Sequence, residues 1–188
     1  MNNFIKIKNI NKKYLKNKTI NVLNDISFNF ESGMVYSIVG PSGSGKSTLL
    51  NLLSLVDVPT SGSIEFNKNK INFKNKVEND YIRAKNIGII HQDKNLLSDF
   101  SAIENIYLPN LLVSNDKKKS FYLAKKIIKK MGLLSRLNHF PSELSGGENQ
   151  RIAIARALIN NPEIILADEP TGSLDFNNAK QIFKILFN

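Results

Sequence analysis

A glycine-rich segment places the tightest constraint on how this chain can fold. Residues 40–48 read GPSGSGKST and satisfy the pattern G-x-x-x-x-G-K-[ST] of a phosphate-binding loop. The residues before it, MVYSIV at 34–39, form an apolar run that predicts a strand covered on both faces. The residues that follow, 46–56, are apolar enough to form a buried helix. A strand, a glycine loop and a helix in this order are half of a βαβ unit, so we expect an α/β fold.

The residue types of this loop fit the binding of a nucleoside triphosphate. Glycines let backbone N–H groups turn toward an anion, and the first turn of the following helix adds its positive dipole end. The Lys46 ammonium is expected to reach the β- and γ-phosphates, and the Ser47 hydroxyl to bind Mg²⁺. The loop residues assigned to phosphate binding are Gly40, Pro41, Ser42, Gly43, Ser44, Gly45, Lys46, Ser47 and Thr48.

A second apolar run ends in two carboxylates. The segment EIILA at 163–167 predicts another buried strand, and Asp168 and Glu169 follow it directly. The carboxyl end of a buried parallel strand is where an Asp that holds Mg²⁺ belongs, so Asp168 is a metal candidate. Glu169 can accept a proton from an attacking water. Alone, such a run is also typical of a strand end with a solvated turn; together with the loop at 40–48 it predicts a hydrolytic site.

A third motif opens a predicted helix. Residues 144–148 read LSGGE, and an apolar stripe follows at Ile152, Ala155 and Ile159. Serine and two glycines at a helix N-terminus form an anion-binding nest. Because the chain already has one phosphate cradle, a second one predicts contact with the nucleotide of another subunit. The alternative is a glycine-rich helix cap without a ligand.

In this order the motifs resemble those of the ATP-binding subunits of ABC transporters, along the whole chain. The resemblance identifies 40–48 as the Walker A loop, Gln92 as the Q-loop and Glu169 as the catalytic base. It implies that ATP and Mg²⁺ bind, that Tyr14 stacks on the adenine and that Gln92 also contacts the nucleotide. The implied metal ligands are Ser47, Gln92 and Asp168. The implied signature residues are Leu144, Ser145, Gly146, Gly147 and Glu148, and the implied D-loop residues are Ser173, Leu174 and Asp175.

The fold implied by the resemblance is a P-loop NTPase with a RecA-like parallel sheet core. An N-terminal antiparallel β-subdomain and an inserted α-helical subdomain complete it. Residues 1–188 are expected to form a single ATP-binding domain, in which 1–92 and 161–188 make the nucleotide-binding core with the β-subdomain. Residues 93–160 are expected to form the helical signature subdomain.

Local patterns predict individual elements along the chain. Alternating apolar and polar residues indicate half-buried strands, and apolar residues at helical spacing opposite lysines indicate an amphipathic helix that Gly132 ends. Besides those named above, the predicted elements are strands at 5–7, 26–30, 63–66, 71–73 and 87–90 and a helix at 116–131.

The resemblance also implies an assembly. Two ATP-binding subunits, identical or paired with a second ATPase, are expected to form a head-to-tail dimer with each ATP between one Walker A loop and the other signature. Binding closes this dimer and hydrolysis reopens it, and the Gln92 region couples the motion to integral-membrane permease subunits.

A narrower resemblance is to the ATPases of lipoprotein-releasing systems, the LolD-like group. The segments that carry it are 95–109, 136–145, 160–162 and 167–172. It implies an enzyme that hydrolyses ATP to release lipoproteins, held by its partners at the cytoplasmic face of the inner membrane. Macrolide-exporter ATPases and FtsE-like ATPases share much of this pattern, so a related transport role or a scaffold role with little turnover is the alternative.

Composition excludes several other classes. The chain has no cysteine, which excludes disulfides, thiolate zinc sites and a cysteine nucleophile. The net charge of +10 comes from lysines dispersed among asparagines, with only four arginines, whereas nucleic-acid readers favour arginine beside aromatic residues. No nucleic-acid partner is therefore expected, and a DNA-associated ABC ATPase is disfavoured because 92–145 lacks the sustained heptads of a coiled coil. No apolar run approaches the roughly 20 residues that span a bilayer.

One family feature has no counterpart in the chain. The resemblance predicts a switch histidine beyond the D-loop, and the two histidines present, His91 and His139, do not match that position. We therefore expect either a fragment of a longer protein or a subunit that binds ATP without hydrolysing it alone.

Overall fold

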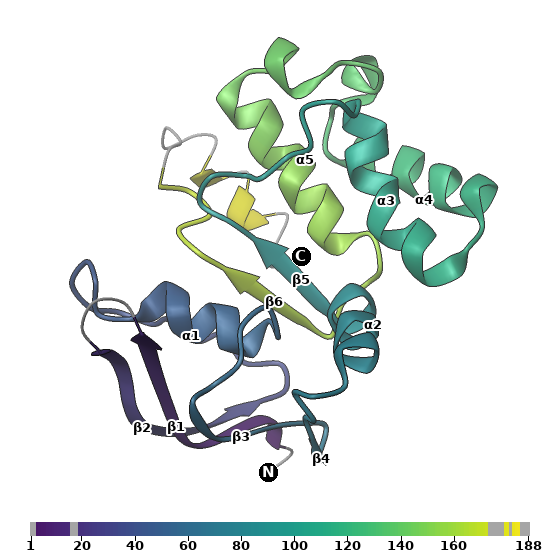
Figure 1. Ribbon diagram of the computed structural model, residues 1–188. Coiled ribbons are helices and arrows are strands. Elements are labelled where there is room, and N and C mark those ends of the chain that lie inside the picture. The colour runs from purple at the N-terminus through teal and green to yellow at the C-terminus, as the bar shows by residue number, and fades with distance from the viewer. Residues whose placement is uncertain (1–2, 16–18, 173–178, 181, 185–188) are drawn as a thin grey trace. The chain divides into compact units, whose positions relative to one another are not determined.

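The chain forms two compact units, Met1–Asp80 and Tyr81–Asn188. The computed structural model describes residues 3–15, 19–172, 179–180 and 182–184 (Figure 1).

An antiparallel sheet dominates the first unit. Its strands, in the spatial order β2-β1-β3-β4, are β1 (Asn3–Leu15), β2 (Thr19–Glu31), β3 (Ser61–Phe66) and β4 (Asn69–Lys70). The predicted strands at 5–7 and 26–30 pair as expected, with Ile7 opposite Phe28. Ile5, Ile7 and Ile64 are almost fully buried, so the alternation in β1 marks the inner face of the sheet, whereas Phe28 in β2 is 48% exposed and the alternation at 26–30 does not mark a buried face.

The hairpin after β3 turns earlier than predicted. Asn67 and Lys68 both have positive φ, 49° and 66°, which is the backbone of a two-residue type I′ turn. This turn pairs Phe66 with Asn69, so the returning strand is 69–70 and the prediction of a strand at 71–73 is wrong. Ile71 is nevertheless buried and donates its N–H to the Ile64 carbonyl at 2.9 Å.

The segment before the glycine loop also differs from its prediction. Residues 34–39 form no strand, and Val35 and Val39 are 72% and 84% exposed. A strand needs a neighbour that accepts and donates ladder hydrogen bonds, and none of the described strands pairs with this segment. Helix α1 (Lys46–Leu53) does follow the loop, buries Leu52 and Leu53 and ends three residues earlier than predicted.

Two parallel strands position the chemistry of the second unit. Strand β5 (Ile87–Ile90) pairs with β6 (Ile164–Ala167), so that Ile90 lies opposite Ala167. Both strands were predicted from their apolar runs, and their parallel pairing confirms an α/β arrangement. Glycine is required in β5, because a Cβ at Gly88 would lie 2.7 Å from the Ala157 carbonyl oxygen.

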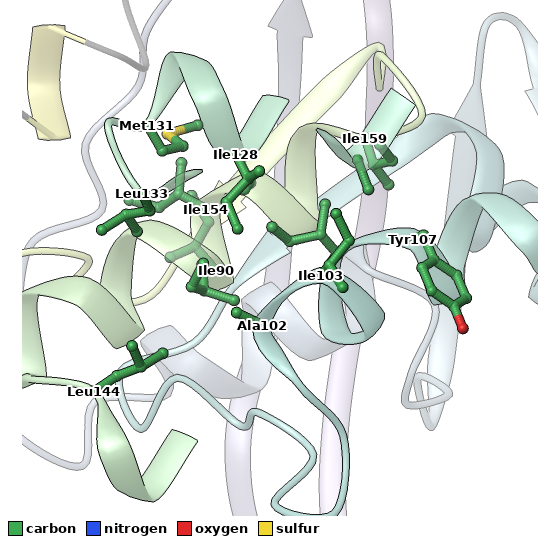
Figure 2. Close-up of a cluster of buried hydrophobic side chains, with 14 of the residues drawn as sticks. Ile90, Ala102, Ile103, Tyr107, Ile128, Met131, Leu133, Leu144, Ile154 and Ile159 are labelled. Carbon is green, nitrogen blue, oxygen red and sulfur yellow. The ribbon is translucent and has the colours of Figure 1, made fainter. Parts of the chain in front are cut away.

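Helix α5 (Gly146–Leu158) packs against β5 and contacts α3 (Ala102–Ser114) and α4 (Lys117–Lys130). Other helical elements are α2 (Lys76–Asn86) and short 3-10 turns at Leu134–Arg136 and Pro141–Glu143. Helix α4 matches its prediction to within one residue, whereas α2 was not predicted. Figure 2 shows the core that α3, α4 and α5 share with β5, in which Ile90, Ile128 and Ile154 are almost fully buried. No helix in the described ranges is both long and apolar enough to cross a bilayer.

Candidate functional site

Glycines shape the loop between residues 40 and 45. Gly43 and Gly45 have positive φ of 79° and 94°, which side chains disfavour. Gly45 is also the N-cap of α1, where a Cβ would lie 2.9 Å from Leu23 Cδ2 and 3.0 Å from the Val22 carbonyl oxygen. Backbone conformation and packing therefore both require glycine at this position.

The Lys46 side chain folds back over the loop. Its Nζ donates hydrogen bonds of 3.0 Å to the carbonyl oxygens of Gly40 and Pro41. These two contacts hold the ammonium over the exposed glycine turn. A cation is thus fixed at the place where an anion would meet the backbone N–H groups.

The N-terminus of α1 is open to a ligand. No side chain caps it, so the N–H groups of its first turn have no side-chain acceptor. The Ser47 side chain is exposed, and Thr48 is half-buried. Together, the glycine turn, the Lys46 ammonium and an uncapped helix end can bind a phosphate chain.

Tyr14 lies on β1 in the same unit and is half-buried. Its phenol donates a 2.7 Å hydrogen bond to Asp57 Oδ2. This hydrogen bond, burial and the Asp57 charge raise the pKa of Tyr14, against a smaller lowering by a hydrogen bond with the Thr48 side chain. The phenol therefore stays neutral, and its ring is tied to Asp57.

The carboxyl ends of β5 and β6 bring two predicted residues together in the second unit. The Asp168 N–H donates to the Ile90 carbonyl at 2.9 Å, which continues the parallel ladder past β6. Directly beyond it, Gln92 Nε2 donates a 3.0 Å hydrogen bond to Glu169 Oε2. Gln92 and Glu169 thus contact each other, as neighbours at one sheet edge.

The turn that carries Glu169 is held from two sides. Glu169 has a positive φ of 47°, and its carbonyl accepts a 3.0 Å hydrogen bond from the Gly172 N–H. On the other side, the buried Gln150 of α5 donates from Nε2 to the Pro170 carbonyl at 2.8 Å. These contacts hold a backbone conformation that is uncommon for glutamate.

The LSGGE motif caps α5 as predicted. Ser145 is the N-cap: its hydroxyl accepts from the Glu148 N–H at 3.2 Å, and Glu148 Oε2 accepts from the Ser145 N–H at 2.8 Å. The Ser145 backbone bond above all, then the Ser145 hydroxyl and Arg136, lower the pKa of Glu148 to about 2. Leu144 is buried in the core cluster of Figure 2 and anchors the motif, whereas Ser145 and Gly146 are exposed.

The donor chemistry fits a hard cation only with help from a ligand. Among the described residues, no three or more His, Cys, Asp or Glu side chains gather to hold a metal ion. The candidates Ser47, Gln92 and Asp168 offer hydroxyl, amide and carboxylate oxygens. Mg²⁺ accepts one or two such protein oxygens together with phosphate oxygens and water. The predicted D-loop residues Ser173, Leu174 and Asp175 lie outside the described residues.

Several residues of these sites escaped sequence reasoning. Arg156 of α5 donates to the carbonyl oxygens of Asn95 and Lys94, at 2.6 and 2.7 Å, and holds the loop after Gln92. Gln150 likewise holds the turn that carries Glu169. Asp57 holds Tyr14, and Lys12 pairs with Asp57. The only signal for them is three-dimensional proximity, since their partners lie between 20 and 62 residues away along the chain, except for Tyr14 beside Lys12.

The sequence is similar to known proteins along almost its whole length. The family model described as "ABC transporter" matches residues 23–172. The chain is 49% identical to the lipoprotein-releasing system ATP-binding protein LolD of Wigglesworthia glossinidia brevipalpis, across 99% of this chain and 82% of that protein. It is 44% identical to the LolD protein of Rickettsia bellii, across 98% of this chain and 81% of that protein.

Solved structures give the same fold. An ATP-binding cassette solved as a dimer in a post-hydrolysis state, bound to ADP and Pi, superposes with a TM-score of 0.90 at 39% identity, over 97% of this chain and 81% of that one. A second dimeric structure, of a bacterial ABC transporter cassette, gives 0.89 at 40% identity, over the same shares.

Proposed function

Since this chain belongs to the ABC transporter family, we propose that it binds and hydrolyses ATP to power the release of lipoproteins from the inner membrane. ATP-binding subunits of this family are ATP hydrolases coupled to transport. The finer assignment of cargo is supported by the identity of nearly half of all residues with a lipoprotein-releasing ATPase, over almost the whole chain.

ATP binding is assigned to the first unit. The glycine turn and the uncapped end of α1 supply N–H donors for the phosphates, and Lys46 adds its charge. Tyr14 supplies an aromatic face on which the adenine stacks. The proposed binding residues of this unit are 40–48 and Tyr14, and the sequence prediction adds Gln92 of the second unit.

Hydrolysis is assigned to Glu169, and the hydrogen bond from Gln92 is the observation that carries this role. The bond orients the carboxylate and leaves it lone pairs with which to accept a proton. When water attacks the γ-phosphorus, a new P–O bond forms and the bond to the β-phosphate oxygen breaks. Glu169 accepts the proton of that water, and the products are ADP and inorganic phosphate.

Mg²⁺ is the cofactor that this chemistry needs. Ser47 and Asp168 are proposed to hold it, with Gln92 as a third oxygen donor, in line with the preference of Mg²⁺ for oxygen ligands. When bound, Mg²⁺ neutralises charge on the β- and γ-phosphates.

The LSGGE motif is proposed to act on the nucleotide of a second subunit. Ser145 and Gly147 engage the γ-phosphate of the partner's ATP, with the dipole of α5 behind them. The space around Gly146 supports this, because a Cβ there would meet no atom of the described residues within 4 Å, so the packing of these residues does not require glycine. Two dimeric structures of one similar cassette support a head-to-tail dimer of this chain or a pair with a second ATPase.

The remaining proposed partners are integral-membrane permease subunits. The loop after Gln92 is the segment proposed to contact them. Arg156 hydrogen-bonds this loop to α5, so a displacement of the loop would also displace the helix that begins with the LSGGE motif. The chain is placed at the cytoplasmic face of the inner membrane, held there by its permeases. Between Gln92 and Ser145, the described helices α3 and α4 have 13 and 14 residues, much shorter than the coiled-coil arms of DNA-associated ABC ATPases.

The proposed cargo is tested in cells depleted of their own lipoprotein-releasing ATPase. Expression of the protein should restore the transfer of lipoproteins from the inner to the outer membrane, and its Lys46→Ala variant should not. Co-purification with a lipoprotein-releasing permease is the second expected result. Failure of rescue by a protein that hydrolyses ATP, or co-purification with division proteins, would contradict the cargo while leaving the ATPase assignment standing.

A further inference from the structure

An ion pair lies directly behind the proposed adenine platform. Lys12 Nζ lies 2.6 Å from Asp57 Oδ1 and also donates to the Val58 carbonyl at 2.7 Å. The other oxygen of the same carboxylate, Oδ2, accepts the Tyr14 phenol at 2.7 Å. One carboxylate therefore holds both a buried lysine and the tyrosine ring.

The backbone explains why these three groups meet. Lys12 and Tyr14 are two residues apart on β1, so their side chains leave the same face of the strand. Asp57 follows α1 in a turn where the N–H groups of Val56 and Asp57 both donate to the Asn51 carbonyl, at 3.0 and 3.1 Å. The Val58 N–H donates to Asp57 Oδ1 at 2.7 Å and fixes the carboxylate further.

The lysine also contacts the ring. Its Nζ lies 4.7 Å from the centroid of the Tyr14 ring, a cation–π distance. Lys12 is only 8% exposed, so its ammonium depends on Asp57 and the Val58 carbonyl for compensation. One face of the ring is thus occupied by a fixed cation, and a base can stack only on the other.

We propose that Lys12 and Asp57 are positioning residues that hold the Tyr14 ring as a one-sided platform for the base of the nucleotide. This inference rests on the proposed role of Tyr14 in adenine binding. Asp57 anchors the phenol and Lys12 covers the rear face, so the ring loses its rotational freedom before a ligand arrives. Preorganisation of this kind raises affinity, because binding then orders fewer groups.

The turn that carries Asp57 gives the platform a second link. It joins the end of α1, whose beginning forms the phosphate cradle, to the strand that carries Tyr14. Base and phosphate contacts of one nucleotide therefore share a rigid connection within the first unit.

The test compares ATP with inorganic tripolyphosphate, which has the phosphates and no base. Dissociation constants of both are measured for the parent, Tyr14→Phe, Asp57→Asn and Tyr14→Ala, with thermal unfolding of each. Tyr14→Phe is the key variant, because it keeps the stacking ring, removes only the bond to Asp57 and unpairs no charge. We expect Tyr14→Phe and Asp57→Asn to weaken ATP binding about fivefold and Tyr14→Ala more, with tripolyphosphate binding unchanged.

Three results would overturn the inference. If Tyr14→Phe binds ATP like the parent while Tyr14→Ala binds weakly, the ring acts without positioning. If the variants bind tripolyphosphate as weakly, relative to the parent, as they bind ATP, the ion pair stabilises the unit as a whole and does not position the Tyr14 ring. If Tyr14→Ala leaves ATP binding unchanged while Lys46→Ala abolishes it, the role of Tyr14 in adenine binding fails and ATP binding stands.

Discussion

Gln92 Nε2 donates a 3.0 Å hydrogen bond to Glu169 Oε2, although 77 residues separate the two along the chain. They meet because β5 and β6 run in parallel and end at paired residues, Ile90 and Ala167, and each of the two side chains lies two residues beyond its strand. Gln92 belongs to the loop that Arg156 holds, and Glu169 is the proposed base. A displacement of that loop would therefore reach the carboxylate through a single hydrogen bond.

Replacing the carboxylate with an amide should separate binding from turnover. Glu169→Gln keeps the size of the side chain but cannot accept a proton from water, so the ATPase rate should fall about 10²–10⁴-fold. The dissociation constant for ATP should stay near that of the parent, and Lys46→Ala serves as the control that loses binding. The measurements are steady-state phosphate release and nucleotide titration; equal turnover in Glu169→Gln and parent would remove Glu169 as the base.

The glycine at the start of α5 should matter to the assembly and not to the fold. No described residue lies within 4 Å of a Cβ built at Gly146, so Gly146→Ala should unfold no more easily than the parent. Turnover should nevertheless fall, because Gly146 lies between Ser145 and Gly147, the residues proposed to engage the γ-phosphate of the partner subunit. ATPase rates and chemical denaturation of the same samples check both statements.

Gly88→Ala provides the contrast for that variant. Its Cβ would lie 2.7 Å from the Ala157 carbonyl oxygen, in backbone that cannot easily move. We expect it to lose about 1–3 kcal/mol of unfolding free energy. Unchanged turnover in Gly146→Ala, or equal stability of the two variants, would contradict the distinction.

Gln150 should contribute to turnover more than to stability. Its Nε2 donates to the Pro170 carbonyl, whereas its buried Oε1 has no hydrogen-bond partner among the described residues. Gln150→Met loses one hydrogen bond of about 1 kcal/mol but also removes a buried oxygen whose burial costs about 1–3 kcal/mol. Stability should therefore be equal or slightly higher, while kcat falls because the Glu169 turn loses an anchor. A large drop in stability with unchanged kcat would reverse this assignment.

The capping box of α5 predicts a pH dependence of stability. Because the pKa of Glu148 falls from 4.5 to about 2 in the folded chain, the unfolded state takes up the proton first as the pH drops. The stabilisation is complete above about pH 4.5 and is lost as the pH falls toward 2. Glu148→Gln keeps the cap acceptor but not the charge, so its stability deficit at neutral pH should shrink in this window. Urea unfolding of both proteins across the range measures it, and a deficit independent of pH would refute the explanation.

The motifs themselves could be predicted from the sequence because their chemistry is local. The glycines at 43 and 45, the capping box of Ser145 and Glu148, and the apolar strands β5 and β6 each depend on neighbours a few residues away. The same holds for α4, whose apolar stripe and terminal glycine are visible in the sequence.

Predictions that depended on distant partners were less successful. The apolar character of 34–39 is real, but an apolar run becomes a strand only beside another strand, and no described strand pairs with it. Helix α2 carries few apolar residues and gave no stripe to recognise. Lys12 and Asp57 lie 45 residues apart along the chain, and no sequence pattern around either residue predicts that they pair.

The two hydrogen bonds of Lys46 turn phosphate binding into an exchange. The ammonium already has the Gly40 and Pro41 carbonyls as acceptors, so an arriving phosphate competes with them for the same donor. The free energy of phosphate binding then reflects the difference between two sets of acceptors for the donors that the backbone already occupies. When a nucleotide leaves, the ammonium can again donate to the Gly40 and Pro41 carbonyls. The backbone of the loop then competes with the phosphate for Lys46 and favours release.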